Sequence, residues 1–320
     1  MAFSYNGDIE EAIKAEKLYI PDGEGHDLKA PIVFQTKRPD DPNNPGHERV
    51  QIEDAVRHMR YAKTLELPTL TQRPIPRLGR AIIVGGAPSV KDHFDEIKEL
   101  AKDPYNRVFA INWSHSWLLD NGFVPDATVF FEIDPEPDSV LLKPHKDITY
   151  YICCHCHEKT FDSLKGYKRV LWHTYPNSDL EKEVSVEIFP DVTYVGGGIG
   201  TFTRTISVAL MLGFRHLDLF GCDSSFPDDK GTHVEGYETP MSAKDDGLFV
   251  YAKDEVSGDV KRFKTLGYLA LQHEEFKEYC RMNHFFFSCR VHGNGLLPWS
   301  HRRMYPLNYV VDELKRDDQV

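Results

Sequence analysis

Two glycine-rich segments directly follow apolar runs, and segments of this kind can bind phosphate. The first is AIIVGGAPS at residues 81–89 and the second is VGGGIGT at residues 195–201. In each, residues without a side chain would let backbone N–H groups approach a ligand, and an amphipathic helix is predicted to follow. This order is typical of a pocket for phosphate or another anion. We therefore expect the chain to bind a nucleotide or another phosphorylated donor.

The first segment contains Gly85, Gly86 and Ser89 at the expected start of a helix. Ser89 could cap that helix or donate its hydroxyl to a phosphate. A tight turn with a purely structural role explains the same residues. No Gly-Lys-Ser or Gly-Lys-Thr follows at the Walker spacing, which argues against a P-loop kinase.

The second segment superficially suggests a dinucleotide fingerprint, but the spacing fails. Glycines at 196 and 198 would require a third glycine at 201, where the chain has Thr201, so NAD is not supported. Gly197, Gly198 and Thr201 could still hold a phosphate or carboxylate at the N-terminus of a helix over residues 200–212. Close packing of that helix, permitted by glycine, is the alternative.

Acidic residues and a histidine follow other predicted strands. Glu132 and Asp134 share one face of a strand end, so joint ligation of Mg²⁺ is sterically allowed, as is a solvated strand end. Asp223 also follows an apolar run. Residues 227–261 beyond it are long, polar and glycine-containing, as an active-site lid would be, and they contain His233. His233 is a candidate general base.

The run Cys153-Cys154-His155-Cys156-His157 has the residue types of a zinc site. If the run is a strand, its side chains alternate between two faces, so all five cannot bind one ion. Buried thiols with histidines at the edge of a pocket are the preferred interpretation, with zinc as the alternative. The chain's 6 cysteines lack the spacing of a disulfide framework and are expected to be reduced.

The hydrophobic pattern predicts an α/β fold with a Rossmann-like, mainly parallel sheet, helices on both faces and an irregular N-terminal extension. The extension contains one expected helix, at residues 51–65. In such a sheet, ligands bind outside the carboxyl ends of the strands. The expected strands are residues 81–84, 108–111, 127–131, 149–154, 169–172, 216–220 and 285–289.

Composition limits the partners. The chain has 320 residues, of which 41% are hydrophobic, and this is enough for a large α/β core. A formal net charge of −12 disfavours nucleic acid and anionic membranes as partners. The first residues lack the pattern of a signal peptide, and no apolar run approaches the ~20 residues that cross a bilayer. We expect a cytoplasmic protein without a membrane span, and homo-oligomerisation is left open.

Several features together resemble one family, the MptE-like proteins. That family includes the 6-hydroxymethylpterin diphosphokinases and the motility accessory factor glycosyltransferases. The bacterial sialyltransferases that use CMP-sugars have a related fold. The resemblance covers residues 80–295, and it rests on the Gly-Ala-Pro-Ser turn at 86–89, Asn112 after a predicted strand, residues 122–126 before an acid-ended strand, and residues 207–213 followed by 216–223.

The resemblance implies a Rossmann-like nucleotide-binding transferase domain at residues 77–295, between the extension at 1–76 and a C-terminal tail at 296–320. It implies that Asp223 lies beside the nucleotide and that His233 acts as the base. We also expect Asp134 to line the nucleotide site without forming an obligatory metal centre with Asp223. The remaining implied contacts to the donor nucleotide, its phosphates and the transferred group are Gly85, Gly86, Ser89, Asn112, Gly197, Gly198 and Thr201.

The function expected from these features is that of a glycosyltransferase with a nucleotide-activated sugar as donor and a hydroxyl acceptor that the sequence does not identify. One alternative is an ATP-dependent pterin diphosphokinase with Mg²⁺ at Asp134 or Asp223. The other is a non-catalytic nucleotide-binding protein. The base and sugar of the donor are left open.

Overall fold

The computed structural model describes residues 47–112, 114–133, 143–175, 179–198, 200–228, 231–235, 248–254 and 256–309, without the side chains of 47–53, 179–181 and 248. Asp134 lies outside the described residues. The described chain divides into two compact units. The first unit contains Val84–Glu99 and residues 216–309, and the second contains residues 47–83 and Leu100–Arg215.

The core of the fold is an eight-stranded sheet with the strand order β10-β7-β1-β2-β3-β4-β5-β6. Within this sheet, the strand pairs whose register is known are all parallel. This confirms the predicted α/β class with a mainly parallel sheet. Strands covered on both faces need a nearly continuous apolar run, which β1 has. The strands are β1 (Arg80–Val84), β2 (Arg107–Ile111), β3 (Ala127–Phe130), β4 (Thr149–Cys153), β5 (Lys168–Thr174), β6 (Tyr194–Val195), β7 (His216–Phe220) and β10 (Ser288–Val291).

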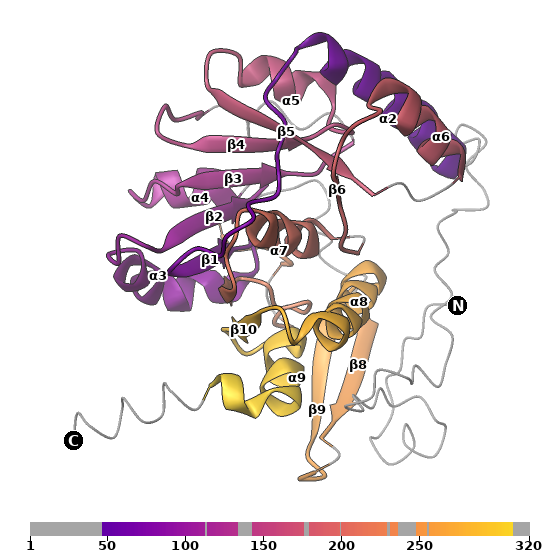
Figure 1. Ribbon diagram of the computed structural model, residues 1–320. Helices are drawn as coiled ribbons and strands as arrows, with labels where there is room; N and C mark the ends of the chain where they lie inside the picture. The colour runs from indigo at the N-terminus through magenta and orange to yellow at the C-terminus, as the bar shows by residue number, and fades with distance from the viewer. Residues whose placement is uncertain are drawn as a thin grey trace. The chain divides into compact units, whose positions relative to one another are not determined.

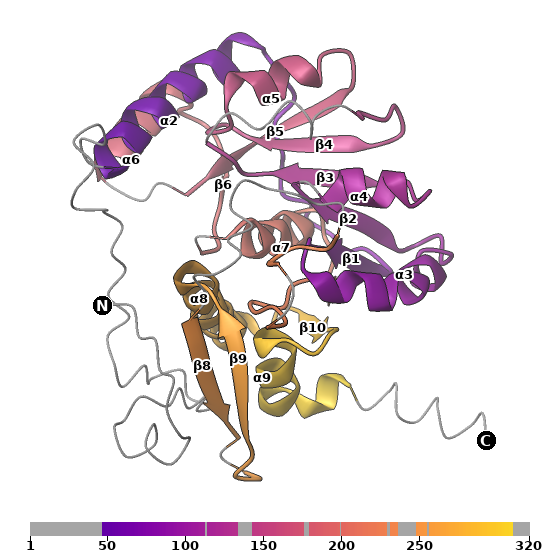
Figure 2. The same cartoon turned by 180° about the vertical axis from the view of Figure 1, so that it is seen from behind.

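The second unit contains helices on both faces of its strands. Helices α4 and α7 both contact β2 and lie on opposite faces, as a comparison of Figures 1 and 2 shows. Helix α2 confirms the helix predicted in the N-terminal extension, and it packs against α5 and α6. The helices are α2 (His47–Thr64), α4 (Ser114–Asp120), α5 (Glu158–Ser163), α6 (Asp179–Ile188) and α7 (Thr201–Met211).

The first unit combines β7 and β10 with an antiparallel hairpin and further helices. The hairpin strands β8 and β9 pair over their whole length. Ala252 and Phe263 of the hairpin form a hydrophobic cluster with Leu296 and Trp299 of α9. The elements are η1 (Pro88–His93), α3 (Phe94–Leu100), β8 (Leu248–Lys253), β9 (Val260–Thr265), α8 (Gly267–Asn283), α9 (Leu296–Met304) and η2 (Pro306–Asn308).

The structure corrects the predicted bounds of some elements. The expected strand at 285–289 is instead β10, three residues later, because Phe285 and Phe286 follow the end of α8 and are exposed. The expected lid at 227–261 contains β8 and the start of β9. The strands expected to reach Phe131 and Cys154 each end one residue earlier, at Phe130 and Cys153. The predicted domain boundaries remain predictions, although α9 lies within the expected tail.

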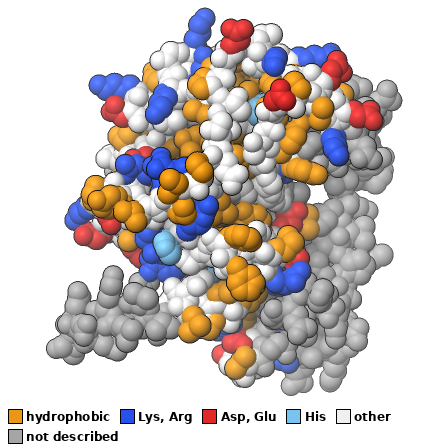
Figure 3. All heavy atoms as spheres, in the orientation of Figure 1, with side chains coloured by type: hydrophobic (Ala, Val, Ile, Leu, Met, Phe, Trp, Pro, Cys, Tyr) orange, Lys and Arg blue, Asp and Glu red, His pale blue; other side chains and the backbone are white. Residues whose placement is uncertain are grey.

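The cysteines lack disulfides, as the sequence predicted, and the surface carries charges of both signs. All 6 of these cysteines are buried. On the face drawn in Figure 3, basic and acidic side chains are interspersed with apolar ones. Within the described residues, no helix has both the length and the apolar character that crossing a membrane requires.

Candidate functional site

The first glycine turn is tied to the end of β7. The Gly85 N–H donates to the Phe220 carbonyl at 2.8 Å, and the Ala87 N–H donates to the Gly221 carbonyl at 3.0 Å. A Cβ on Gly85 would lie 2.4 Å from the Gly221 carbonyl oxygen, and Gly221 has a φ of +62°. Glycine is therefore required here for close packing of two strand ends. A phosphate at this turn would have to use donors other than the Gly85 and Ala87 N–H groups.

Ser89 and Asp223 present two buried polar atoms that have no hydrogen-bond partner of good geometry among the described residues. These atoms are Ser89 Oγ and Asp223 Oδ1. Both lie beside Gly293, whose added Cβ would come within 2.9 Å of Ser89 Oγ and 2.6 Å of Asp223 Oδ1. A Cβ on Gly295 would meet the Asp223 Cβ at 2.4 Å. Buried polar atoms are normally satisfied, so this pair is where a ligand or a water molecule would be expected to bind.

Burial raises the pKa of Asp223 to about 6, although Ser89 and the Gly295 backbone partly offset the effect. The carboxyl group can therefore gain or lose a proton near neutral pH. A perturbed acid of this kind at the carboxyl end of a strand is typical of a functional site.

His233 lies in a segment attached to the first glycine turn. The neighbouring Val234 N–H donates to the Gly86 carbonyl at 2.8 Å. The Nδ1 atom of His233 lies 2.8 Å from Thr232 Oγ1, and burial lowers the pKa of the ring to about 4. The imidazole is therefore neutral at pH 7 and can accept a proton, as a general base must.

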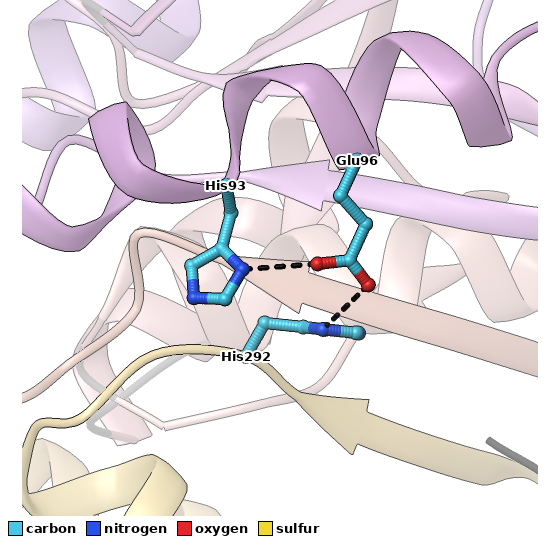
Figure 4. Close-up of side chains that lie close together, drawn as sticks. All are labelled: His93, Glu96 and His292. Carbon is cyan, nitrogen blue, oxygen red and sulfur yellow. Dashed lines mark hydrogen bonds and ion pairs between the residues drawn. The ribbon is translucent and has the colours of Figure 1, made fainter. Parts of the chain in front are cut away.

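A charged cluster that the sequence analysis missed lies in the same unit. His292 Nε2 lies 3.0 Å from Asp218 Oδ1, and Arg290 Nε donates to the same oxygen at 2.6 Å. Glu96 faces two rings, with His93 Nδ1 at 2.9 Å and His292 Nδ1 at 3.2 Å from its oxygens (Figure 4). His93 and Glu96 have helical i,i+3 spacing. That spacing is the only local sign of the cluster in the sequence, because His292 is distant in sequence and joins the other two residues from the end of β10.

These contacts change the pKa values of the cluster. Hydrogen bonds from His292 and His93 hold the pKa of Glu96 far below its usual range. Burial lowers the pKa of His292, but its contacts with Asp218 and Glu96 outweigh this effect and raise it overall. Glu96 is therefore ionised near neutral pH.

In the second unit, Asn112 joins three elements. Its Nδ2 donates to Glu132 Oε1 at 2.5 Å and to Thr201 Oγ1 at 3.2 Å, and its Oδ1 accepts from the Phe131 N–H at 3.1 Å. These contacts hold the ends of β2 and β3 and the first residue of α7 together. Asn112 itself has a φ of +44°, a conformation that asparagine tolerates better than most residues. The amide is thus a positioning group, and its predicted contact with a nucleotide stays a prediction.

The second glycine loop is packed against α7. Gly197 has a φ of +113°, and an added Cβ would lie 2.9 Å from the Thr203 carbonyl. The buried Arg204 donates through Nε to the Gly198 carbonyl at 2.9 Å and through Nη1 to the Val195 carbonyl at 3.0 Å. The first turn of α7 contains no acidic residue. The helix N-terminus and the buried guanidinium both favour an anion at this loop.

The Cys–His run at 153–157 does not alternate as a strand, because β4 ends at Cys153. The alternation argument against shared ligation was therefore based on the wrong geometry. Burial raises the pKa of the Cys154 and Cys156 thiols, which keeps them protonated. Burial also lowers the pKa of His155 to about 3. These side chains are part of the packed interior of the second unit.

The predicted site residues thus fall into two groups. Gly85, Gly86, Ser89, Asp223 and His233 belong to the first unit, and the contacts described above link them through the β1 and β7 ends. The second unit contains Asn112, Gly197, Gly198 and Thr201.

Comparison with known proteins places the chain in context. A family model described as "6-hydroxymethylpterin diphosphokinase MptE-like" matches residues 60–229, which is more than half of the chain. No curated protein matches the sequence. The MAf glycosyltransferase from Magnetospirillum magneticum AMB-1 has a similar structure, with a TM-score of 0.57 and 18% identity over 77% of this chain and 37% of its own. This likeness shows a shared fold, over little more than a third of that protein.

A mammalian sialyltransferase is a weaker match. Its TM-score is 0.34 at 11% identity, with 87% of each chain covered. A likeness at this level supports no argument about fold or function.

Adjacent glycines in the second loop should respond differently to alanine. Gly197→Ala should lower the free energy of unfolding by about 1–3 kcal/mol, because of the positive φ and the contact with Thr203. Gly196→Ala should change it by less than about 0.5 kcal/mol, because nothing lies within 4 Å of the added Cβ. Urea unfolding of both variants measures the difference. Equal effects would show that packing on α7 does not require a glycine at 197.

Asp223→Asn should stabilise the protein in a pH-dependent way. A carboxyl pKa raised by burial costs stability as the pH rises from about 4 to 6, and the amide does not ionise. We expect a gain of up to about 3 kcal/mol at pH 8 and a much smaller one at pH 4, measured by urea unfolding. The exposed Asp259→Asn is the matched control. The same gain at both pH values would contradict the assignment.

Proposed function

The chain belongs to the 6-hydroxymethylpterin diphosphokinase MptE-like family, and on that premise we propose that it transfers a group from a nucleotide-activated donor. The specific proposal is a glycosyltransferase that uses a nucleotide sugar. The fold shared with the MAf glycosyltransferase is consistent with this activity. The donor site proposed here is in the first unit.

The observation that carries the proposal is the buried pair Ser89 Oγ and Asp223 Oδ1, neither of which has a hydrogen-bond partner of good geometry among the described residues. A nucleotide has the complementary groups, since its ribose hydroxyls donate hydrogen bonds and its phosphate oxygens accept them. An ionised Asp223 would accept from a ribose hydroxyl, and Ser89 would donate to an oxygen of the donor. The glycines at 293 and 295 leave the space that the Asp223 side chain occupies.

In the proposed reaction, the bond between the sugar's anomeric carbon and the phosphate oxygen breaks, and a bond to the acceptor oxygen forms. The acceptor hydroxyl loses its proton to a ring nitrogen of His233, which is neutral because burial lowers its pKa. The nucleotide leaves with the bonding electrons and its negative charge. The contacts predicted for Asn112, Gly197, Gly198 and Thr201 belong to the second unit and stay predictions.

An ATP-dependent pterin diphosphokinase is the second candidate, and the name of the matched family favours it. That reaction moves a pyrophosphoryl group and concentrates negative charge, which a divalent metal normally neutralises. The sequence analysis placed Mg²⁺ at Asp134 or Asp223. Of these two, Asp223 is among the described residues.

A ligand panel tests the proposal. The thermal unfolding of purified protein would be measured with CMP, UDP, GDP, ADP and the sugar conjugates of these nucleotides. It would also be measured with ATP, in the presence and absence of Mg²⁺. A ligand at a hundred times its Kd should stabilise the protein by about 2.7 kcal/mol, which shifts the Tm by several degrees. Turnover of a sugar nucleotide supports the glycosyltransferase, and pterin-dependent consumption of ATP supports the kinase. Stabilisation without turnover would indicate a binding protein, and no stabilisation by any nucleotide would refute the proposed donor site.

His233→Gln tests the role of the base. Glutamine keeps the approximate size and polarity of the side chain but cannot accept the proton, so turnover should fall roughly a hundredfold or more. Donor affinity in the thermal assay should change little. His284→Gln, at an exposed histidine in the same unit, is the control and should leave turnover unchanged. Wild-type turnover in His233→Gln would exclude this residue as the base.

A further inference from the structure

Three potential metal ligands converge beside the turn that follows β1. His93 is the last residue of η1, Glu96 is in the first turn of α3, and His292 directly follows β10. One ligand atom from each lies within 4.8 Å of the others. Figure 4 shows the two rings directing nitrogen atoms to the two oxygens of Glu96.

The spacing suits a tetrahedral metal ion. Zn²⁺ binds nitrogen and oxygen at about 2.0–2.2 Å, so neighbouring ligand atoms in a tetrahedral site are about 3.3 Å apart. His93 Nδ1 lies 2.9 Å from Glu96 Oε2, and His292 Nδ1 lies 3.2 Å from Glu96 Oε1, so each ring nitrogen is at a suitable separation from one carboxylate oxygen. Two imidazoles and one carboxylate form a ligand set that zinc uses, and such a set leaves a fourth position for water or another ligand.

Asp218 supplies the outer support that such a ligand needs. Its Oδ1 lies 3.0 Å from His292 Nε2, and the side chain is fully buried. A carboxylate that accepts from Nε2–H leaves the Nδ1 lone pair of His292 free to bind a metal. Arg290 Nε donates to the same oxygen at 2.6 Å and holds the carboxylate in place.

The charges and the access also fit a cation. Glu96 and Asp218 are the carboxylates that contact His292, and Arg290 is the cation that contacts Asp218. With neutral histidines, these three charged groups leave one negative charge, which favours a cation over an anion. The Glu96 side chain is 44% exposed, so an ion can enter from solvent.

We infer that His93, Glu96 and His292 bind a divalent metal ion, with Zn²⁺ as the ion that their chemistry favours. The three ligands are different residues from Asp134 and Asp223, for which the sequence analysis expected no obligatory metal centre. The inference is independent of the proposed transferase activity, because a metal can bind here in an enzyme or in a binding protein.

Calorimetric titration of the full-length chain tests the site. The protein would be treated with EDTA, desalted and titrated with ZnCl₂, and in parallel with MnCl₂ and MgCl₂. We expect one zinc ion per chain. Absence of zinc binding would mean that the cluster is an ion-pair network, and binding of Mn²⁺ or Mg²⁺ without Zn²⁺ would overturn the assignment of the metal.

Variants locate the bound ion. His93→Ala removes a partly exposed ligand and should abolish or strongly weaken zinc binding, while circular dichroism shows the same fold. His284→Ala, at an exposed histidine outside the cluster, should bind like the wild type. Asp218→Asn should lower affinity about 10–100-fold through the orientation of His292. Equal zinc binding by His93→Ala and the wild type would overturn the site.

Discussion

The close crossing of the chain at Gly85 and Gly221 is the constraint on which the first unit depends. Each backbone lies where the Cβ of the other would be, and the Gly85 and Ala87 N–H groups bind the end of β7. This contact sets the start of η1 and therefore the positions of Ser89 and His93. It also sets the direction in which the chain leaves β7 towards Asp223. A side chain at either glycine would force the two backbones apart, and it would therefore move Ser89 and His93 away from Asp223.

The buried charges depend on one another in a second way. Asp218 is removed from water, so its charge is tolerable only because Arg290 and His292 both contact it. Loss of one partner from such a buried group generally costs about 3–5 kcal/mol, since the remaining charge is left uncompensated. The position of His292 is thus coupled to the packing of β7 against β10. The partly exposed Glu96 is the member that can change partner most easily.

The sequence predicted the parallel strands well because each is a short apolar run buried on both faces. It missed the start of β10 because Phe285 and Phe286 have high β-propensity but follow the end of α8, where the chain turns. The error hid the position of His292, which directly follows the true strand. Asp223 was found because it follows β7 without any such ambiguity. The buried environment of its carboxyl group depends on Gly293 and Gly295, which are distant in sequence, and no local pattern reveals it.

Burial favours the uncharged form of both Asp223 and His233. It therefore raises the pKa of the carboxyl group and lowers the pKa of the imidazole. The two pKa values, about 6 and about 4, leave both side chains neutral between these limits. Above pH 6 the carboxyl group is charged while the imidazole stays neutral.

Because the charge of Asp223 changes near pH 6, the affinity for a ligand that contacts this carboxyl group must depend on pH. A ligand that donates a hydrogen bond to Asp223 favours the charged form and binds more tightly as the pH rises through 6. A phosphate oxygen placed against the same carboxyl group needs the protonated form and binds less tightly. The direction of this dependence therefore distinguishes a ribose hydroxyl from a phosphate at Asp223.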